Sequence, residues 1–428
     1  MKKTIFTAIL LGAAVALCSC SLGVDSRGLL SPPKTTGREA AIEKLVEEAS
    51  GGNYQLKYPN SGSYRSAIIT EDLNQDNNDE AFAFYTSRSE NTVHMLVMYS
   101  EKNEWKISGD FKTDHSDVDC VMFVDYDFDG TLEILAGFSG SAELNELNIF
   151  DYDPEKKVSE SIDFSASYSG FSAGDYDRDG GSEILTLSLS VGEDEAQASL
   201  IDYDNNTLYT LSDCYLDPSV TRFENITSGL LDKNTMGVAV DGALDGGFNT
   251  QVIFYDADKS ELVSFPSSEK KETSIFRTYN INSQDINHDG FIEIPVAYAE
   301  AGPSTEKTAP VINWRNLNTK KSKLVNSTRC VNNLDFGFYF KLPEYFSDAV
   351  FATLSEDSRE MKIYAEENDL LLTFKVFDVG ESSDKMKEFT TLESYNQYIY
   401  AYQIGESTTL YVDDDIIRDN FALIDIGA

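Results

Sequence analysis

The sequence predicts a mainly β protein built from a repeating unit of about 50 residues, followed by a smaller C-terminal α+β domain. The first observation is an acidic loop that starts at residues 72, 125, 175 and 285, at intervals of 53, 50 and 110 residues. The second is an apolar strand that recurs about 25 residues after each loop start. A fixed interval of this length is typical of repeat architectures and propellers.

Each acidic loop places oxygen-bearing side chains at its positions 1, 3, 5 and 9. The loops run from Asp72 to Glu80, from Asp125 to Glu133, from Asp175 to Glu183 and from Asp285 to Glu293. Such alternation lets one turn of backbone direct several oxygens at a hard cation, and Gly or Asn at position 6 permits a left-handed bend. The loops therefore predict cation sites and also mark the phase of the repeat.

A fifth, degenerate copy of the loop is expected near residue 230, because the interval of 110 residues is twice 55. Asp232, Asn234 and Gly237 stand there in register, whereas Met236 and Val240 occupy positions where ligands belong. With this copy the intervals become 53, 50, 57 and 53 residues. We expect this fifth loop to have lost its ion.

The strands around each loop indicate how one repeat folds. The strand before the second loop is apolar at alternate positions, as at Met122 and Val124, whereas residues 134–136 after the loop are continuously apolar, as in a buried strand. Each repeat thus reads as four short strands, with the loop between the first two, which is the size of a propeller blade. Separate hairpin domains would leave too many strand edges exposed. We predict a β-propeller of four-stranded blades, with five repeats recognised and six or seven blades possible.

The N-terminus predicts export and lipid attachment. Lys2 and Lys3 precede an apolar run over residues 4–17, which is too short to be a comfortable membrane-spanning helix. Cys20 follows the small residue Ser19, and this segment resembles the lipobox of bacterial lipoproteins. We expect a signal peptide over 1–19, a tether over 20–36 lipidated at Cys20, and an extracytoplasmic protein anchored to a bacterial membrane by lipid. The alternative is an ordinary cleaved secretory signal.

Two domains are expected after the tether. The propeller should cover residues 37–330, beginning with a helix over 38–49 that stops at Gly51. Residues 331–428 lack the loop repeat and are expected to form the α+β domain. Within it we expect strands over 360–365, 370–376, 408–412 and 421–426, with a Lys- and Glu-rich amphipathic stretch over 386–400. Residues 336–343 and the strand order are similar to small PsbP-like domains.

The repeated loops and their flanking strands resemble FG-GAP repeats of the VCBS type, found in the integrin α-chain propeller and in bacterial surface proteins. The resemblance covers about residues 53–325 and implies structural Ca²⁺ at about four sites, with side chains at positions 1, 3, 5 and 9 and a backbone carbonyl at position 7 as ligands. The implied ligands are Asp72, Asn74, Asp76, Asn78 and Glu80; Asp125, Asp127, Asp129, Thr131 and Glu133; Asp175, Asp177, Asp179, Gly181 and Glu183; and Asp285, Asn287, Asp289, Phe291 and Glu293. An EF-hand is excluded because it needs Glu at position 12, where this chain has Ala83, Ala136, Thr186 and Val296.

Charge and composition limit the partners and the chemistry. The net charge of −39 disfavours nucleic acid and anionic membrane surfaces, so contact with the membrane is expected through the lipid anchor only. The chain has three histidines and no serine-nucleophile, phosphate-loop or His-Glu-x-x-His motif. We therefore expect a non-catalytic module that binds an extracellular glycan or protein. The alternative is a polysaccharide hydrolase or lyase that uses an acid pair on the propeller face.

Overall fold

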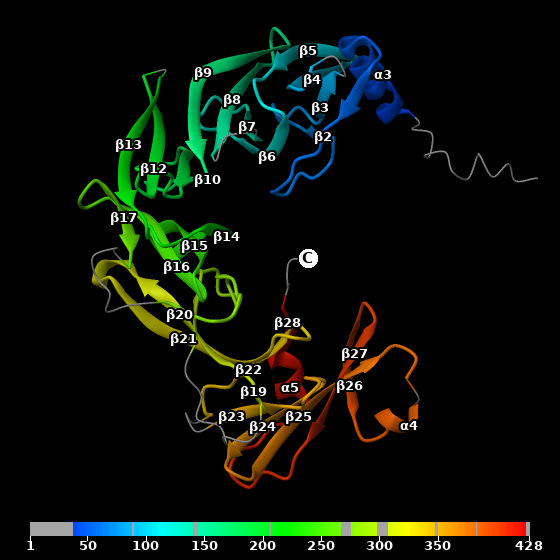
Figure 1. The fold of residues 1–428 in the computed structure, drawn as a ribbon, viewed down its shortest axis with the longest axis vertical. Coiled ribbons are helices and arrows are strands. Elements are labelled where there is room, and N and C mark those ends of the chain that lie inside the picture. Colours follow the sequence, from blue (N-terminus) through cyan, green and yellow to red (C-terminus); the bar gives the residue numbers. More distant parts are fainter. Residues whose placement is uncertain are drawn as a thin grey trace, which may run out of the picture. The chain divides into compact units, whose positions relative to one another are not determined.

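The computed structural model describes residues 37–87, 90–139, 144–205, 207–266, 275–297, 307–346, 350–381 and 383–424 (Figure 1). The expected signal peptide (1–19), the tether (20–36) and the lipid-bearing Cys20 lie outside the described residues. Antiparallel strands dominate the described chain, as predicted, and no helix in it is long and apolar enough to cross a bilayer. These residues fall into two compact units.

The first unit contains residues 37–58, 66–72 and 76–114 and is a five-stranded antiparallel sheet with one helix. Its strands are β1 (Tyr54–Leu56), β2 (Ile68–Glu71), β3 (Glu80–Ser87), β4 (Val93–Glu101) and β5 (Glu104–Lys112). Strands β1 and β2 both pair with β3, and the sheet continues through β4 to β5. The first acidic loop joins β2 to β3, as the repeat predicted.

Helix α3 (Arg38–Ser50) packs on this sheet through a short apolar stripe. Ile42 and Val46 lie one turn apart and are buried against apolar residues of β3 and β4, such as Ala83. The helix ends at Gly51, whose φ of 72° is the left-handed conformation that glycine adopts without strain. The predicted helix over 38–49 and its stop are confirmed.

The second unit begins with three four-stranded antiparallel sheets in which consecutive strands pair. They are β6 (Asp117–Val124), β7 (Glu133–Ser139), β8 (Asn145–Asp153) and β9 (Val158–Tyr168); β10 (Gly170–Gly174), β11 (Glu183–Ser188), β12 (Gln197–Asp204) and β13 (Thr207–Tyr215); and β14 (Arg222–Asp232), β15 (Thr235–Leu244), β16 (Gly247–Asp256) and β17 (Glu261–Phe265) (Figure 1). The predicted order of strand, loop, strand, turn, strand, turn, strand is confirmed in the first two of these sheets.

Consecutive sheets of the second unit share hydrophobic cores. On β11, Ile184 packs with Leu135 of the preceding sheet, whereas Leu185 packs with Val238 of the following sheet. The alternation follows from the two-residue period of a strand, which sends neighbouring side chains to opposite faces. Both faces of the second strand of each sheet are therefore covered, which explains why its sequence is continuously apolar.

Two larger sheets complete the second unit. The five-stranded sheet has the order β18 (Ile294–Ala297), β20 (Val311–Asn318), β21 (Lys323–Asn333), β22 (Phe338–Leu342) and β28 (Phe421–Leu423). The six-stranded sheet has the order β19 (Lys307–Thr308), β23 (Phe351–Leu354), β24 (Glu360–Glu366), β25 (Asp369–Asp378), β27 (Tyr398–Ile404) and β26 (Thr390–Tyr395). Short helices are η2 (Thr319–Lys321), α4 (Ser383–Met386) and α5 (Asp414–Asn420). Strand β21 crosses position 330 and pairs with both β20 and β22, so its sheet continues past the expected boundary.

The structure corrects or refines three local expectations. The expected fifth repeat is present as the β14–β17 sheet, but its loop is a tight hairpin, because β14 ends at Asp232 and β15 begins at Thr235. Residues 408–412 form no strand. Most of the Lys- and Glu-rich amphipathic stretch over 386–400 belongs to the β26–β27 hairpin, and five of the six residues of β26 are exposed.

A buried ion pair lies at the β14–β17 sheet, which has a hairpin in place of an acidic loop. The side chains of Arg277 and Asp241 are both 0% exposed, and Arg277 Nη2 lies 2.8 Å from Asp241 Oδ1. Arg277 also donates to the Ile281 carbonyl and to Thr250 Oγ1, while Asp241 accepts from the Ser283 N–H. These hydrogen bonds compensate two charges that would otherwise be costly to bury.

Removing one partner of this pair should destabilise the protein strongly. Arg277→Met leaves Asp241 buried without a cation, and we expect the free energy of unfolding to fall by about 3–5 kcal/mol. Arg222→Met is the matched control, because Arg222 pairs with Glu224 at the surface and should change stability little. Urea denaturation of both variants measures the difference, and equal effects would contradict the assignment.

Candidate metal centres

All four acidic loops share one backbone conformation, with positive φ angles at positions 4 and 6. The residues and angles are Gln75 and Asn77 (57° and 66°), Phe128 and Gly130 (65° and 88°), Arg178 and Gly180 (69° and 101°), and His288 and Gly290 (61° and 90°). The bend at position 6 was predicted from its Gly and Asn residues. The bend at position 4 was missed, because Gln, Phe, Arg and His share no turn signal there.

The same two hydrogen bonds close every loop. The N–H of position 6 donates to the position 1 carboxylate, and the N–H of position 7 donates to the position 5 carboxylate. The first set joins Asn77, Gly130, Gly180 and Gly290 to Asp72, Asp125, Asp175 and Asp285 at 2.8, 3.2, 3.4 and 2.8 Å. The second set joins Asn78, Thr131, Gly181 and Phe291 to Asp76, Asp129, Asp179 and Asp289 at 2.8, 2.7, 2.7 and 3.0 Å. The loop is thus wrapped around its own carboxylates.

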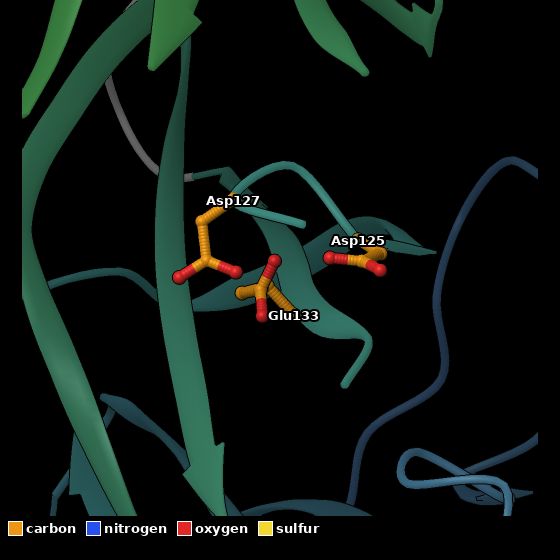
Figure 2. A group of neighbouring side chains, drawn as sticks. All are labelled: Asp125, Asp127 and Glu133. Carbon is orange, nitrogen blue, oxygen red and sulfur yellow. The ribbon is translucent and has the colours of Figure 1, made fainter. Parts of the chain in front are cut away.

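Three of the four loops bring three carboxylates together. The groups are Asp125, Asp127 and Glu133; Asp175, Asp177 and Glu183; and Asp285, Asp289 and Glu293. In each group one carboxylate oxygen per residue lies within 4.8 Å of the others, and Figure 2 shows Glu133 between the two aspartates. Within the described chain, the carboxylates of the first loop, Asp72, Asp76 and Glu80, form no such group. These three groups could each hold a metal ion.

The residues at positions 3 and 5 make different contacts in different loops. Asp129 and Asp179 lie outside the three-carboxylate groups and hold the N–H groups described above. In the fourth loop Asn287 Nδ2 donates to both Asp289 and Glu293, so that its amide joins two members of the group. In the first loop Asn74 and Asp76 are the residues at these positions, and the Asn78 amide donates to Asp76.

Unpartnered buried oxygens test whether a cation fits these groups. Glu133 and Glu183 are each 1% exposed, and the Oε1 atom of each has no hydrogen-bond donor, nor does Asp125 Oδ1. The other oxygen of each glutamate accepts the N–H of Tyr126 or Tyr176. Buried carboxylate oxygens are normally satisfied by a donor or a cation, so the residues fit an oxygen-liganded metal ion.

Burial and neighbouring charge raise the pKa values of Glu133, Glu183 and two aspartates beside them. The pKa of Glu133 rises to about 9 and that of Glu183 to about 8, chiefly because burial disfavours the charged form. Burial followed by repulsion from neighbouring aspartates also raises the pKa values of Asp127 and Asp177. The groups that contain Glu133 and Glu183 therefore favour the uptake of protons or of a metal ion near neutral pH.

Two further acidic residues face these groups and were missed from the sequence. Asp151 on β8 and Asp202 on β12 lie opposite Glu133 and Glu183 in the strand register, and their charges contribute to the raised pKa values of those glutamates. They occur 26 and 27 residues after the starts of their loops. The spacing was visible, but only the strand pairing reveals the contact.

A pocket of about 330 Å³ lies between the second and third loops. It is lined by Tyr126, Asp127, Phe128, Asp179, Gly181, Asp202 and Tyr203. Phe128 is 64% exposed, although its ring lies beside Gly180 and Gly181, about where a side chain at either glycine would begin. The other three loops place Gln, Arg and His at this position, so the loop conformation does not require an aromatic ring there. The pocket combines carboxylate oxygens with aromatic faces, which are the groups that line small-ligand sites.

Comparisons with known proteins do not assign this chain to a family or to an activity. No protein-family model matches the chain, and no curated protein is similar to it in sequence. Among solved structures, the chain is similar to the rhamnogalacturonan lyase PL11 of Bacillus licheniformis, with 10% identity and a TM-score of 0.30 over 82% of this chain and 72% of that one. Likeness at this TM-score carries no argument about the fold or the activity.

The metal-free protein should lose stability as the pH rises. Glu133 and Glu183 have folded-state pKa values near 9 and 8 against 4.5 for an ordinary glutamate, so the folded state holds more protons between these limits. Their contribution is fully present below about pH 4.5 and is lost as the pH rises towards 9. We expect the Tm of the metal-stripped protein to fall over this range, and the Glu133→Gln/Glu183→Gln variant to show a flatter profile. Equal slopes for both proteins would contradict the assignment.

Proposed function

We propose that the chain is a calcium-stabilised, propeller-type binding module that presents a glycan- or protein-binding surface outside the cell. The observation that carries the proposal is the pair of carboxylate groups at Glu133 and Glu183, each with a buried oxygen that lacks a donor. The same loop conformation recurs in four sheets. Because the same loop is repeated in four sheets, we take its role to be stabilisation of each repeat rather than catalysis.

Calcium is favoured over other ions by the donor set. Every group consists of carboxylate oxygens, with no histidine or cysteine among them, whereas structural zinc sites use nitrogen and sulfur. Magnesium prefers to keep several waters and a strict octahedron, which suits a wrapped protein loop less well. Bound calcium would neutralise carboxylates whose burial is otherwise unfavourable, and its binding energy would add to folding stability.

The propeller arrangement is favoured by the shared cores of the second unit. Each of its four-stranded sheets buries apolar side chains against the next sheet, as at Ile184 and Leu185, and a closed ring of such sheets leaves only short edges. The number of blades is part of the proposal. So are the lipid on Cys20 and the extracytoplasmic location, which rest on the resemblance of residues 1–20 to a lipoprotein signal.

Binding is favoured over catalysis by the chemistry around the loops. Carboxylates that hold a cation stay ionised and are poor general acids. The pocket beside Phe128 offers an exposed aromatic ring and carboxylate oxygens, which suit the apolar face and the hydroxyl groups of a sugar or of a protein side chain. The alternative is a polysaccharide hydrolase or lyase that uses an acid pair on the propeller face.

Calcium should raise the thermal stability of the protein. We expect the Tm to fall on chelation, to recover with CaCl₂, and to recover less with MgCl₂ at equal concentration, because the sites favour the larger ion. Asp125→Asn and Asp175→Asn, each made singly, should reduce the calcium-dependent part of the shift, while Asp163→Asn, at an exposed residue on β9, serves as a charge-matched control. A Tm that does not respond to chelation would sink the calcium proposal.

Binding and catalysis can be separated in one screen. The purified protein, loaded with calcium, is incubated with cell-wall and host polysaccharides and with extracellular-matrix proteins, and both retention and product release are read. We expect retention of at least one class without products, and weaker retention by Phe128→Ala, which removes an exposed ring that the fold does not need. Release of oligosaccharides would favour the enzyme alternative.

A further inference from the structure

We propose that Asp151 and Asp202 are additional calcium ligands, which give the second and third loops stronger sites than the fourth loop. Neither residue belongs to an acidic loop: each lies on the third strand of its sheet. The inference rests on the proposed calcium function and deepens it by ranking the sites.

The strand register places these aspartates beside the loop glutamates. In the first four-stranded sheet of the second unit, Ile134 pairs with Phe150, so Glu133 and Asp151 follow as the next opposite pair. In the next sheet Ile184 pairs with Ile201, which sets Glu183 opposite Asp202. Opposite residues of an antiparallel pair have Cβ atoms only about 4.5–5.5 Å apart, so like charges at such positions repel directly.

The fourth loop has an amide at the equivalent position. There Ile294 pairs with Arg315, which sets Glu293 opposite Asn316. Asn316 Nδ2 donates to Glu293 Oε1 at 3.0 Å, and Asn287 Nδ2 donates to the same oxygen at 3.1 Å. This buried glutamate, 0% exposed, is therefore satisfied by the protein itself.

The contrast explains which buried oxygens lack donors. Glu133 Oε1 and Glu183 Oε1 are without a donor, and each faces an aspartate, which in its ionised form can only accept. Asp202 is held in place by the Tyr203 N–H and the Tyr209 hydroxyl, at 2.6 and 2.7 Å. Asp151 likewise accepts the N–H of the tyrosine that follows it, Tyr152. Two fixed carboxylates that face each other across a strand pair, one of them buried, can both be ionised at low cost only with a cation between them.

Charge count then ranks the sites. With Asp151 the group of the second loop has four carboxylates, with Asp202 that of the third loop also has four, and the group of the fourth loop has three, namely Asp285, Asp289 and Glu293. Calcium affinity in proteins rises with the number of charged ligands and with the rigidity of the site. The two sites with a strand aspartate should therefore fill first as calcium is added.

A reciprocal exchange of the two side chains tests the proposal. Asp151→Asn gives the second site the amide of the fourth site, and Asn316→Asp gives the fourth site the carboxylate of the second. The full metal-stripped chain is titrated with CaCl₂ by calorimetry, and its Tm is measured with and without calcium. Asp163→Asn, exposed on β9 of the same sheet as Asp151, is the control for charge and size.

The two exchanges should act in opposite directions. Asp151→Asn should raise the Tm of the metal-free protein, because the amide can donate to Glu133 Oε1, and should weaken one tight calcium site about 10- to 100-fold. Asn316→Asp should lower the metal-free Tm and strengthen one weak site. Asp202→Asn repeats the first change in another sheet, which guards against a variant that fails to fold.

The outcomes separate the two proposals. Calcium binding by the wild-type chain that Asp151→Asn and Asp202→Asn leave unchanged would overturn the role of the strand aspartates and leave the calcium function standing. No calcium binding by the wild-type chain would overturn both. A loss of affinity equal to that of Asp163→Asn would reduce the effect to net charge and also overturn the inference.

Discussion

A buried glutamate at the point where the chain enters a strand is the constraint on which each loop-bearing sheet depends. Glu80, Glu133 and Glu183 begin β3, β7 and β11, and Glu293 directly precedes β18. All four are at most 4% exposed, although the residues that follow them are apolar. Burying a carboxylate costs several kcal/mol unless hydrogen bonds and a counter-charge compensate it. In the last three of these sheets a backbone N–H of the loop satisfies one oxygen and leaves the second to another partner. The conformation of the loop follows from that requirement, because the loop must place its backbone N–H groups close to the carboxylate of the glutamate at its end.

The sheet formed by β14–β17 meets the same problem without a loop. Its hairpin turn is only two residues long, and Asp232 accepts the backbone N–H groups of Asn234 and Thr235 instead of facing a cation. A charge is nevertheless buried in this sheet, at Asp241, and its counter-ion is the guanidinium of Arg277. The guanidinium is an internal cation that is present whatever the calcium concentration, whereas a calcium ion in the proposed loop sites would be lost on chelation. Under this proposal the unit would combine one sheet that is stabilised from within with others whose stability depends on an ion in the medium.

The repeat could be predicted from the sequence because loop and strands leave local signals. Alternating oxygens, a Gly or Asn at position 6 and continuously apolar strands each report on a few neighbouring residues, and the sheets and three carboxylate groups are where these signals placed them. What the sequence could not supply depends on residues that are distant along the chain. Asp151 faces Glu133 only through the register of β7 and β8, and Arg277 reaches Asp241 across 36 positions. The sequence did not distinguish a tight hairpin at Asp232 from a degenerate metal loop, because Asp, Asn and Gly favour both.

The pocket beside the second and third loops connects the two parts of the proposed function. Asp127 and Asp179 line it, and both belong to loops that we propose to be calcium loops. A ligand held there by the outward oxygens of these residues would change the affinity of the loops for calcium. By linkage, calcium would change the affinity for that ligand by the same factor. The strongly acidic chain, with a net charge of −39, would repel an anionic ligand unless the cations were in place. Partner binding at this pocket and calcium occupancy of its neighbouring loops are therefore expected to be one coupled equilibrium.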